Sequence, residues 1–477
     1  DRVDAELRSK IHDALLEVGT NPELATALET LVGFVEIDDE YHEMRESIAR
    51  QAASEVSERP AATSDQAEAT RPAGSSRPDE KATSAWPGWR GPTRDGRVAS
   101  LPSTLPKEPA MVWRQALHRP GLGGIAATED FVILGDRDIS NTFDEFRCYT
   151  AADGQLLWTV QYPAPGTLDY DNTPRATPLI HDGHVYLLGA FGDLTCVELE
   201  TGVTLWQMNV INDFGGDAEL VWGVCSSPLI VDGKLIMNPG GPDASVVALD
   251  PLTSEVLWQS PGDLHAYSSF IVATLGGVRQ LVGYDRTSLG GWDIETGRRL
   301  WTLKPPYDGD FNVPTPVAID GKLLVATENN YVRIYAFDDA GQIKPQPVAV
   351  NDSLAPDTST PVVVGNRVFC VRLDMFCLDL TNGLKPIWVG EDKAFCDYSP
   401  LIASDDRVLA VGAGGELLLV DATADEFRIV SRLKLFGDEP EQRAEVLAHP
   451  ALVGTRLYFR GEKELVCVEL SPDTASN

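Results

Sequence analysis

Short apolar runs separated by polar turn residues recur from Trp86 onward and predict β-strands. The clearest unit is Cys196–Trp206, in which a strand, a Thr-Gly turn and a second strand end on tryptophan. The same frame recurs at Cys148–Trp158, Ala248–Trp258 and Gly291–Trp301, and a version one residue longer spans Cys377–Trp388. A repeat of this kind indicates a fold built from similar units.

A second repeated phrase precedes each frame. In its clearest form it is an apolar strand, an Asp-Gly turn and another apolar strand, which is the pattern of a β-hairpin. Three clear copies begin at Ala176, Ser226 and Pro314; further copies begin at Thr360, Ser399 and His449, and weaker ones at Ile125 and Ser268. Each phrase and its frame supply four strands. Eight such units predict an all-β fold, an eight-bladed β-propeller with four-stranded blades.

The two ends of this repeat array complement each other. The last frame stops after one strand, near Leu465–Glu469, and has no tryptophan. Residues 111–117 form a strand that carries Trp113 and has no frame of its own. We therefore expect 111–117 to be the outer strand of the eighth blade, which closes the ring and removes its open edges. The tryptophans expected to dock one blade against the next are Trp113, Trp158, Trp206, Trp258, Trp301 and Trp388.

The chain before the propeller divides into two parts. Residues 1–51 carry apolar positions at helical spacing and predict a small helical segment, either self-packed or docked on a partner. Residues 52–85 are rich in Ala, Ser, Thr, Pro and acidic residues and predict a disordered linker. The propeller is expected to span residues 86–477. The first residue is aspartate, so a signal or a membrane tether upstream of Asp1 is left open.

Charge narrows the choice of partners. The formal net charge is −33 and the pI is about 4.5. Such a surface repels phosphate backbones and anionic lipid headgroups, which argues against nucleic acid as a partner. It favours basic partners, cations or simple solubility. The seven cysteines are an odd number, and four of them occupy the small-residue position of the frame, where we expect them to be buried packing residues.

Loops that interrupt the repeat are the best candidates for function, because the fold does not require them. The longest are expected on one face of the ring, around its axis, and they combine acids with aromatic residues. A basic or extended peptide, a sugar or Ca²⁺ would suit such a rim, and solvated loops without a ligand are the alternative. The candidate binding face comprises Asp169, Tyr170, Asp171, Arg175, Phe214, Trp222, Arg286, Asp308, Asp310, Phe311 and Arg372.

Other candidate sites have simpler explanations in the repeat. His181-Asp-Gly-His184 aligns with the Asp-Gly hairpins, so it predicts a turn and not a metal pair. Gly412-Ala-Gly-Gly415 falls between two strands and predicts a turn and not a phosphate loop. The sequence contains no Gly-x-Ser-x-Gly, His-Glu-x-x-His or Walker pattern, so no catalytic residue is assigned.

The tryptophan frame resembles the docking repeat of PQQ-like (quinoprotein-like) eight-bladed propellers. Residues 86–96, Trp-Pro-Gly-Trp-Arg-Gly-Pro-Thr-Arg-Asp-Gly, also resemble the opening segment of many secreted bacterial PQQ-like proteins. One branch of this family consists of dehydrogenases that hold PQQ and Ca²⁺ on the axis, typically with an adjacent cysteine pair. The other includes the propeller lipoprotein of the outer-membrane β-barrel assembly machinery.

This chain has no adjacent cysteine pair and resembles the second, non-catalytic branch more closely. The resemblance implies a scaffold that binds protein partners in the bacterial periplasm, in the cell envelope or outside the cell, with no cofactor. A PQQ- and Ca²⁺-dependent oxidoreductase and a carbohydrate- or peptide-binding module remain the alternatives.

Overall fold

The computed structural model describes residues 85–217, 221–396, 398–436 and 446–471. The helical segment expected at 1–51 lies outside these residues, and so does the linker expected at 52–85 except for Ala85. The described residues belong to one compact unit, residues 80–477. No helix in the described ranges is long and apolar enough to cross a membrane.

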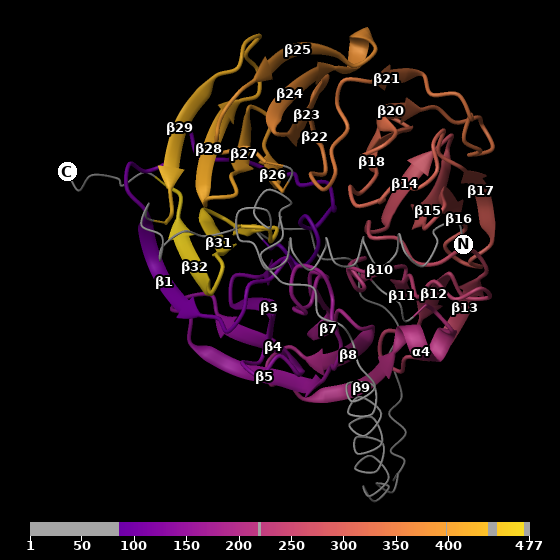
Figure 1. Ribbon diagram of the computed structural model, residues 1–477, viewed down its shortest axis with the longest axis vertical. Helices are drawn as coiled ribbons and strands as arrows, with labels where there is room; N and C mark the ends of the chain where they lie inside the picture. The colour runs from indigo at the N-terminus through magenta and orange to yellow at the C-terminus, as the bar shows by residue number, and fades with distance from the viewer. Residues whose placement is uncertain (1–84, 218–220, 397, 437–445, 472–477) are drawn as a thin grey trace, which may run out of the picture. The chain divides into compact units, whose positions relative to one another are not determined.

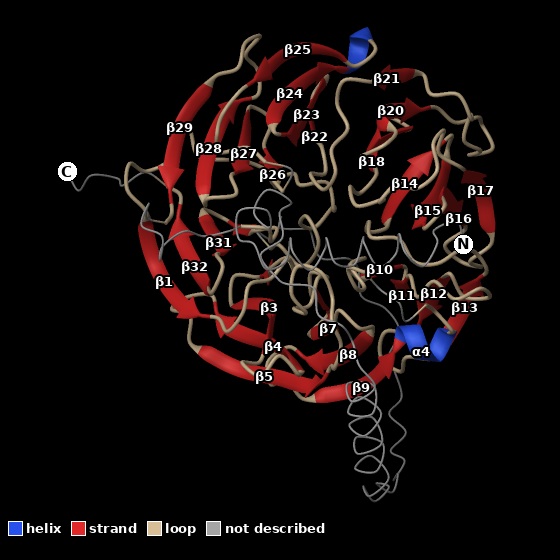
Figure 2. Cartoon of the chain, viewed as in Figure 1, coloured by secondary structure: helices blue, strands red, loops and turns tan. Residues whose placement is uncertain are grey.

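Eight four-stranded antiparallel sheets make up this unit and are arranged around a common axis, which confirms the eight-bladed propeller (Figures 1 and 2). Blade 1 contains β2 (Ala126–Ala127), β3 (Phe131–Arg137), β4 (Phe143–Thr150) and β5 (Leu156–Pro163). Blade 2 contains β6 (Leu179–His181), β7 (His184–Leu188), β8 (Asp193–Glu198) and β9 (Thr204–Asn209). Blade 3 contains β10 (Leu229–Val231), β11 (Lys234–Met237), β12 (Val246–Leu249) and β13 (Val256–Ser260). Blade 4 contains β14 (Ile271–Leu275), β15 (Val278–Asp285), β16 (Ser288–Trp292) and β17 (Arg299–Leu303).

The remaining blades follow in chain order. Blade 5 contains β18 (Val317–Ile319), β19 (Lys322–Thr327), β20 (Tyr331–Tyr335) and β21 (Ala349–Asn351). Blade 6 contains β22 (Val362–Val364), β23 (Arg367–Arg372), β24 (Asp374–Asp379) and β25 (Lys385–Gly390). Blade 7 contains β26 (Leu401–Ala403), β27 (Arg407–Val411), β28 (Glu416–Asp421) and β29 (Ile429–Lys434). Blade 8 contains β30 (Ala451–Val453), β31 (Arg456–Arg460), β32 (Glu464–Glu469) and β1 (Ala110–Ala116). Two short helices lie elsewhere: α4 (Val210–Phe214) follows β9, and η1 (Leu380–Asn382) lies between β24 and β25.

The Asp-Gly phrases form the inner hairpins of their blades. In blade 2, Asp182 and Gly183 have φ values of 46° and 76°. Two consecutive residues with positive φ are what a type I′ turn requires, and that turn matches the twist of its strands. The His181–His184 segment is therefore the hairpin turn that the repeat predicted, with the two histidines paired across β6 and β7.

The first and last parts of the described chain meet in blade 8. Strand β1 pairs antiparallel with β32, and Trp113 lies opposite Cys467. The strand expected at 111–117 is thus found at Ala110–Ala116, beside the last repeat. Figure 1 shows the indigo β1 next to the yellow β32. This pairing removes the exposed edge that an incomplete last blade would leave.

Each complete tryptophan frame places its small first residue directly opposite the tryptophan, and a β-bulge follows that pair. In blade 2, Cys196 lies opposite Trp206, and the register shifts at the next residue, Val197, which pairs with Thr204. Because these two residues face each other across the strands, the first residue must leave room for the indole. The four frame cysteines are buried free thiols, which confirms their role as small packing residues; they are Cys148, Cys196, Cys377 and Cys467.

The indole groups connect neighbouring blades. Trp113 Nε1 donates to the backbone carbonyl of Ala151 at 3.1 Å, and Trp158 Nε1 donates to that of Leu199 at 2.8 Å. Three further indoles donate to a carbonyl of the next blade at 3.0–3.1 Å, namely Trp206 to Pro251, Trp258 to Ile294 and Trp388 to Ala424. Each indole therefore packs as a large apolar group while its polar N–H is satisfied.

Candidate functional site

A cavity of about 400 Å³ lies among the segments that lead into the innermost strands, on the side of the ring that carries the outer-to-inner connections between blades. We call this side the loop face. Connections on the loop face do not repeat in sequence, so their side chains differ from blade to blade. The residues that line the cavity are Trp89, Leu122, Tyr170, Arg175, Trp222, Cys225, Tyr267, Ser269, Phe311, Val313, Glu328, Asp357, Thr358, Ser359, Thr360, Tyr398, Pro400, Leu401, Leu447 and His449. A cavity of this size is in the range of ligand-binding pockets.

Hydroxyl groups tie neighbouring blades together around the cavity. Thr177 N–H donates to Ser227 Oγ, and Ser227 N–H donates to Ser269 Oγ, both at 3.0 Å. On the other side of the ring, Thr315 N–H donates to Thr360 Oγ1, also at 3.0 Å. These bonds satisfy backbone donors that approach the axis, and they fix the positions from which the lining side chains project.

Residues 86–97 contribute Trp89 to the lining of the cavity, and we call them the floor segment. The N–H of Trp86 donates to Ala127 in blade 1, and the carbonyl of Gly96 accepts from Ala403 in blade 7. Trp89 lies between these ends, lines the cavity and donates from Nε1 to Thr315 Oγ1 at 2.9 Å. The segment that resembles a secreted-protein opening therefore crosses the axis and contacts blades on opposite sides of the ring.

Two buried arginines anchor the floor segment. Arg90 Nη2 donates to the carbonyl of Pro361 at 2.7 Å, and Arg94 donates to the carbonyls of Pro228 at 2.8 Å and Ser227 at 3.1 Å. Burial lowers the pKa of Arg90 to about 10 and that of Arg94 to about 9. Both guanidinium groups donate to backbone carbonyls of the inner segments, so the arginines serve as structural anchors.

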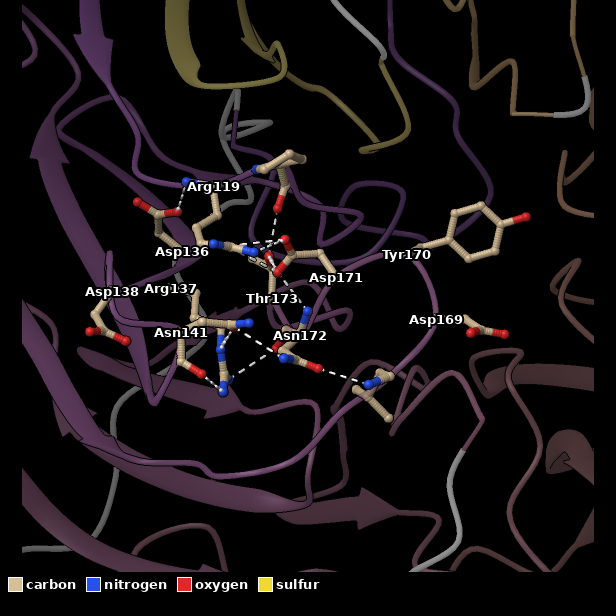
Figure 3. A network of polar contacts seen from close by, with 12 residues as sticks. Arg119, Asp136, Arg137, Asp138, Asn141, Asp169, Tyr170, Asp171, Asn172 and Thr173 are labelled. Carbon is tan, nitrogen blue, oxygen red and sulfur yellow. Dashed lines mark hydrogen bonds and ion pairs between the residues drawn. The ribbon is translucent and has the colours of Figure 1, made fainter. Parts of the chain in front are cut away.

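Tyr170 reaches the cavity from a loop in an unusual backbone conformation. Tyr170 and the next residue, Asp171, have φ values of 58° and 73°, which are uncommon for residues other than glycine. Arg119 clamps the loop by donating to Asp171 from Nε at 3.0 Å and from Nη2 at 2.6 Å. Figure 3 shows this ion pair, with the Tyr170 ring directed away from it. The clamp holds the strained turn that presents Tyr170.

A second arginine supports the same loop from below. Arg137 is fully buried and pairs with Asp144, with 2.6 Å between Nη1 and Oδ1. It also donates to Asn141 Oδ1 at 2.6 Å and to the carbonyl of Asn172 at 3.2 Å (Figure 3). Burial nevertheless raises the pKa of Asp144 to about 7, and the carboxylate of Asp193 adds to this effect. Burial of the Arg137–Asp144 ion pair therefore costs free energy. The hydrogen bond from Arg137 to the carbonyl of Asn172 fixes the loop that carries Tyr170.

The structure brings together only part of the binding face expected from the sequence. Four of its residues line the cavity: Tyr170, Arg175, Trp222 and Phe311. The others lie outside the lining, and these are Asp169, Asp171, Phe214, Arg286, Asp308, Asp310 and Arg372. Asp310 is 9% exposed and bonds to Asn329 and Asn330, and Arg372 lies 3.8 Å from Asp357.

Sequence reasoning missed several lining residues. Tyr267, Asp357 and Tyr398 belong to the connections that lead into blades 4, 6 and 7, Glu328 belongs to the short β19–β20 turn, and Trp89 belongs to the floor segment. One signal was available for Trp89, because two tryptophans and two arginines fall within a few residues outside any repeat frame. The three connections and the turn offered no comparable signal.

A group of potential metal ligands lies elsewhere, in and beside blade 1, at His118, Asp136 and Glu145. Arginine nitrogens already surround it. Arg147 Nη2 lies 2.6 Å from Glu145 Oε2, 3.3 Å from Asp136 Oδ2 and 2.7 Å from the His118 ring, and Arg460 Nη2 lies 3.5 Å from Asp136. The carboxylates are therefore neutralised by guanidinium groups, and we interpret the cluster as an ion-pair network.

The lining does not fit PQQ with Ca²⁺. The carboxylates of PQQ need cationic or N–H donors, and Arg175, the one arginine among the described lining residues, donates to the backbone carbonyls of Trp222, Tyr170 and Asp171. Glu328 and Asp357 would place two further negative charges beside the carboxylates of PQQ. Among the described residues, no group of three or more His, Cys, Asp or Glu ligands gathers at the cavity, so an oxygen cage for Ca²⁺ would have to come from other groups.

The closed ring of eight blades, its tryptophan docking and its axial cavity define a PQQ-like propeller. More specifically, the sequence profile of the family described as "Outer membrane protein assembly factor BamB" matches residues 106–263 and 274–428. Because the match covers more than half of the chain, the chain belongs to this family.

Individual relatives are distant. The chain is 28% identical over 184 residues to the outer membrane protein assembly factor BamB of Salmonella typhimurium, an alignment that covers 38% of this chain and 42% of that protein. The structure of BamB from Moraxella catarrhalis matches with a TM-score of 0.52 and 15% identity, over 75% of this chain and 99% of that one. The quinohemoprotein alcohol dehydrogenase ADHIIG from Pseudomonas putida HK5 matches with a TM-score of 0.59 and 12% identity, over 83% of this chain and 81% of that one. These likenesses in structure show the fold alone.

Proposed function

We propose that this propeller is a non-enzymatic scaffold of the bacterial cell envelope that binds a protein partner through its loop face. Support comes from the family, whose name refers to outer membrane protein assembly. The observation that carries the proposal is a pair of exposed aromatic rings at the cavity: Tyr170 is 54% exposed and Phe311 is 41% exposed. Exposed aromatic residues that gather from separate loops are typical of interaction sites.

The surrounding charge agrees with a protein partner. Acidic residues flank both rings, including Asp169 and Asp308, and the whole chain carries a net charge of −33. Long-range attraction would therefore favour a partner with a basic surface, and salt would weaken it. The ion pair between Arg119 and Asp171 keeps the Tyr170 loop in place before any partner binds, which reduces the entropy cost of association.

Photo-crosslinking in the full chain tests the proposal. A photo-reactive amino acid is placed at Tyr170, at Phe311 and, as a control, at Leu252, which is 56% exposed in a turn on the opposite face. In bacterial envelopes, we expect Tyr170 and Phe311 to capture the same component of outer-membrane assembly, identified by mass spectrometry, and Leu252 to capture none of it. Equal capture at all three positions, or capture at Leu252 alone, would contradict the proposal.

A further inference from the structure

One side of the axial cavity is an aromatic wall, formed by Trp222, Tyr267 and Phe311. The ring centroids of Trp222 and Phe311 are 4.3 Å apart, and those of Trp222 and Tyr267 are 5.0 Å apart. The three residues come from the connections that lead into blades 3, 4 and 5. Such a cluster offers ring faces and edges to a group that enters from the loop face.

Two carboxylates line the same cavity beside this wall. The N–H of Phe311 donates to Glu328 Oε1 at 3.3 Å, so Glu328 is adjacent to the aromatic wall. Asp357 also lines the cavity. Burial raises the pKa of Glu328, and the carboxylates of Asp357 and Asp310 raise it further. A raised carboxyl pKa means that negative charge at this position lacks full compensation.

The nearest basic groups offset only part of that charge. Arg175 directs its guanidinium to the backbone carbonyls of Trp222 and the Tyr170 loop. His449 is neutral at physiological pH, because burial lowers its pKa to about 3. Arg372 lies 3.8 Å from Asp357 and its charge also lowers the pKa of Glu328, so it offsets part of the negative charge, but burial and the neighbouring carboxylates still leave the pKa of Glu328 raised. The cavity thus combines aromatic faces with acidic groups, which is the pairing that attracts organic cations.

We propose that the axial cavity binds a lysine or arginine side chain presented by an extended segment of the protein partner. This inference rests on the proposed scaffold function and names the group that the scaffold recognises. The charged end would lie between the aromatic wall and Glu328, and the apolar stem would contact Tyr170 and Tyr398, whose ring centroids are 6.2 Å apart. A cavity of about 400 Å³ has room for the basic side chain and part of its neighbours.

A neutral isostere provides the sharpest test. The probe is the blocked peptide acetyl-Gly-Pro-Lys-Pro-Gly-amide, and its control is the same peptide with norleucine in place of lysine. Both are titrated into the full chain by calorimetry. We expect saturable binding of the lysine peptide alone, with an affinity that falls as salt is added because the attraction is electrostatic. Equal binding of the norleucine peptide would overturn the inference, and so would a lack of saturable binding at millimolar peptide.

Two variants locate the site. Glu328→Gln removes the charge and Phe311→Ala removes one ring of the wall, and we expect each to raise the Kd of the lysine peptide at least tenfold. Glu200→Gln is the matched control, since Glu200 is exposed in the β8–β9 turn on the opposite face. An unchanged Kd in Glu328→Gln would overturn the inference, and a circular-dichroism melt checks that each variant is folded.

The crosslinking experiment separates the two proposals. If Tyr170 and Phe311 capture a partner while the lysine peptide does not bind, the scaffold function stands and cation recognition fails. If the peptide binds in a Glu328-dependent way and no partner is captured, cation recognition stands as a property of the cavity and the scaffold function fails.

Discussion

Trp301 donates its indole N–H to the side-chain carbonyl of Gln280, 2.5 Å away in its own blade. Gln280 in turn donates from its amide nitrogen to the backbone carbonyl of Gly341 in blade 5, at 3.2 Å. The other five frame or closing-strand tryptophans reach a carbonyl of the next blade directly. The contact between blades 4 and 5 therefore passes through a glutamine, although the sequence frame around Trp301 looks the same as the others.

Replacing this glutamine should destabilise the ring. Gln280→Leu keeps the volume but leaves the Trp301 N–H and the Gly341 carbonyl without their partner. Each orphaned buried group costs about 1–3 kcal/mol, so we expect the free energy of unfolding to fall by at least about 1 kcal/mol in urea titrations. Gln207→Leu, at an exposed position of β9, is the control and should change stability by less than ~0.5 kcal/mol. Equal effects of the two changes would contradict the prediction.

A methyl group at Gly291 should be costly. A Cβ added there would lie 2.2 Å from Trp301 Nε1 and 2.3 Å from Gln280 Oε1. These two atoms are hydrogen-bonded to each other, so they cannot move apart freely. We therefore expect Gly291→Ala to lower the free energy of unfolding by about 1–3 kcal/mol through overpacking. Ala248, at the same position of another frame, shows that the frame itself tolerates a methyl group. Thermal melts of Gly291→Ala and the wild type measure the difference, and an unchanged Tm would refute the argument.

Buried His449 should make the protein sensitive to acid. Its pKa is lowered from 6.5 to about 3 by burial, with Arg90 nearby, so the unfolded chain binds a proton that the folded chain does not. The stability from this group is complete above about pH 6.5 and is lost as the pH falls towards 3. At pH 4.5 the loss is about 2–3 kcal/mol. His449→Phe, which keeps a ring against Trp86 and Trp89, should remove this component.

The measurement is the free energy of unfolding at pH 7 and pH 4.5 in the wild type and in His449→Phe. Asp144 acts in the opposite direction, because its pKa is raised to about 7 and acid therefore favours its folded form. The comparison between variant and wild type cancels that contribution. His181→Phe, at a half-exposed hairpin position, is the control for the replacement of a histidine by phenylalanine. An identical pH dependence in His449→Phe and the wild type would be inconsistent with this prediction.

The buried pair beneath the Tyr170 loop allows a double-mutant test. Arg137→Met leaves Asp144 buried without its partner, which typically costs about 3–5 kcal/mol. Arg137→Met combined with Asp144→Leu removes both charges and should recover part of this loss. Urea titrations of the single and double variants measure the coupling. If the single variant is no less stable than the double variant, the pair does not hold the loop in the way described.

The sequence was sufficient to predict the closed ring of blades, but it did not identify most of the residues that line the cavity at the axis. The frame that ends at Trp206 repeats at fixed spacing because each blade packs against the next one in the same way. The strand around Trp113 could be recognised as the closing strand because the last repeat lacked its outer strand. Tyr170 and Trp222 could be proposed because they lie in long loops. Glu328 could not, since it lies in a short turn and becomes a lining residue only when eight connections converge.

The same limit applies to Trp301 and to the floor segment. Gln280 is one polar residue in a strand, and its importance depends on the distance between two blades, which local patterns do not encode. Trp89 stands close to the start of the described chain, yet its partner Thr315 lies more than two hundred residues later. Contacts across that separation follow from ring closure, which no periodicity within one repeat specifies.

The floor segment also determines how the propeller would bear mechanical load. The chain enters the propeller at Trp86. Beyond it, Arg90, Arg94 and Gly96 form hydrogen bonds with segments of blades 6, 3 and 7, respectively. A force applied to the chain upstream of Trp86 would be shared among inner segments on several sides of the axis. It would reach the closing strand β1 only after those bonds had broken. The ring is thus protected from being peeled open at its seam by tension from its own N-terminal extension.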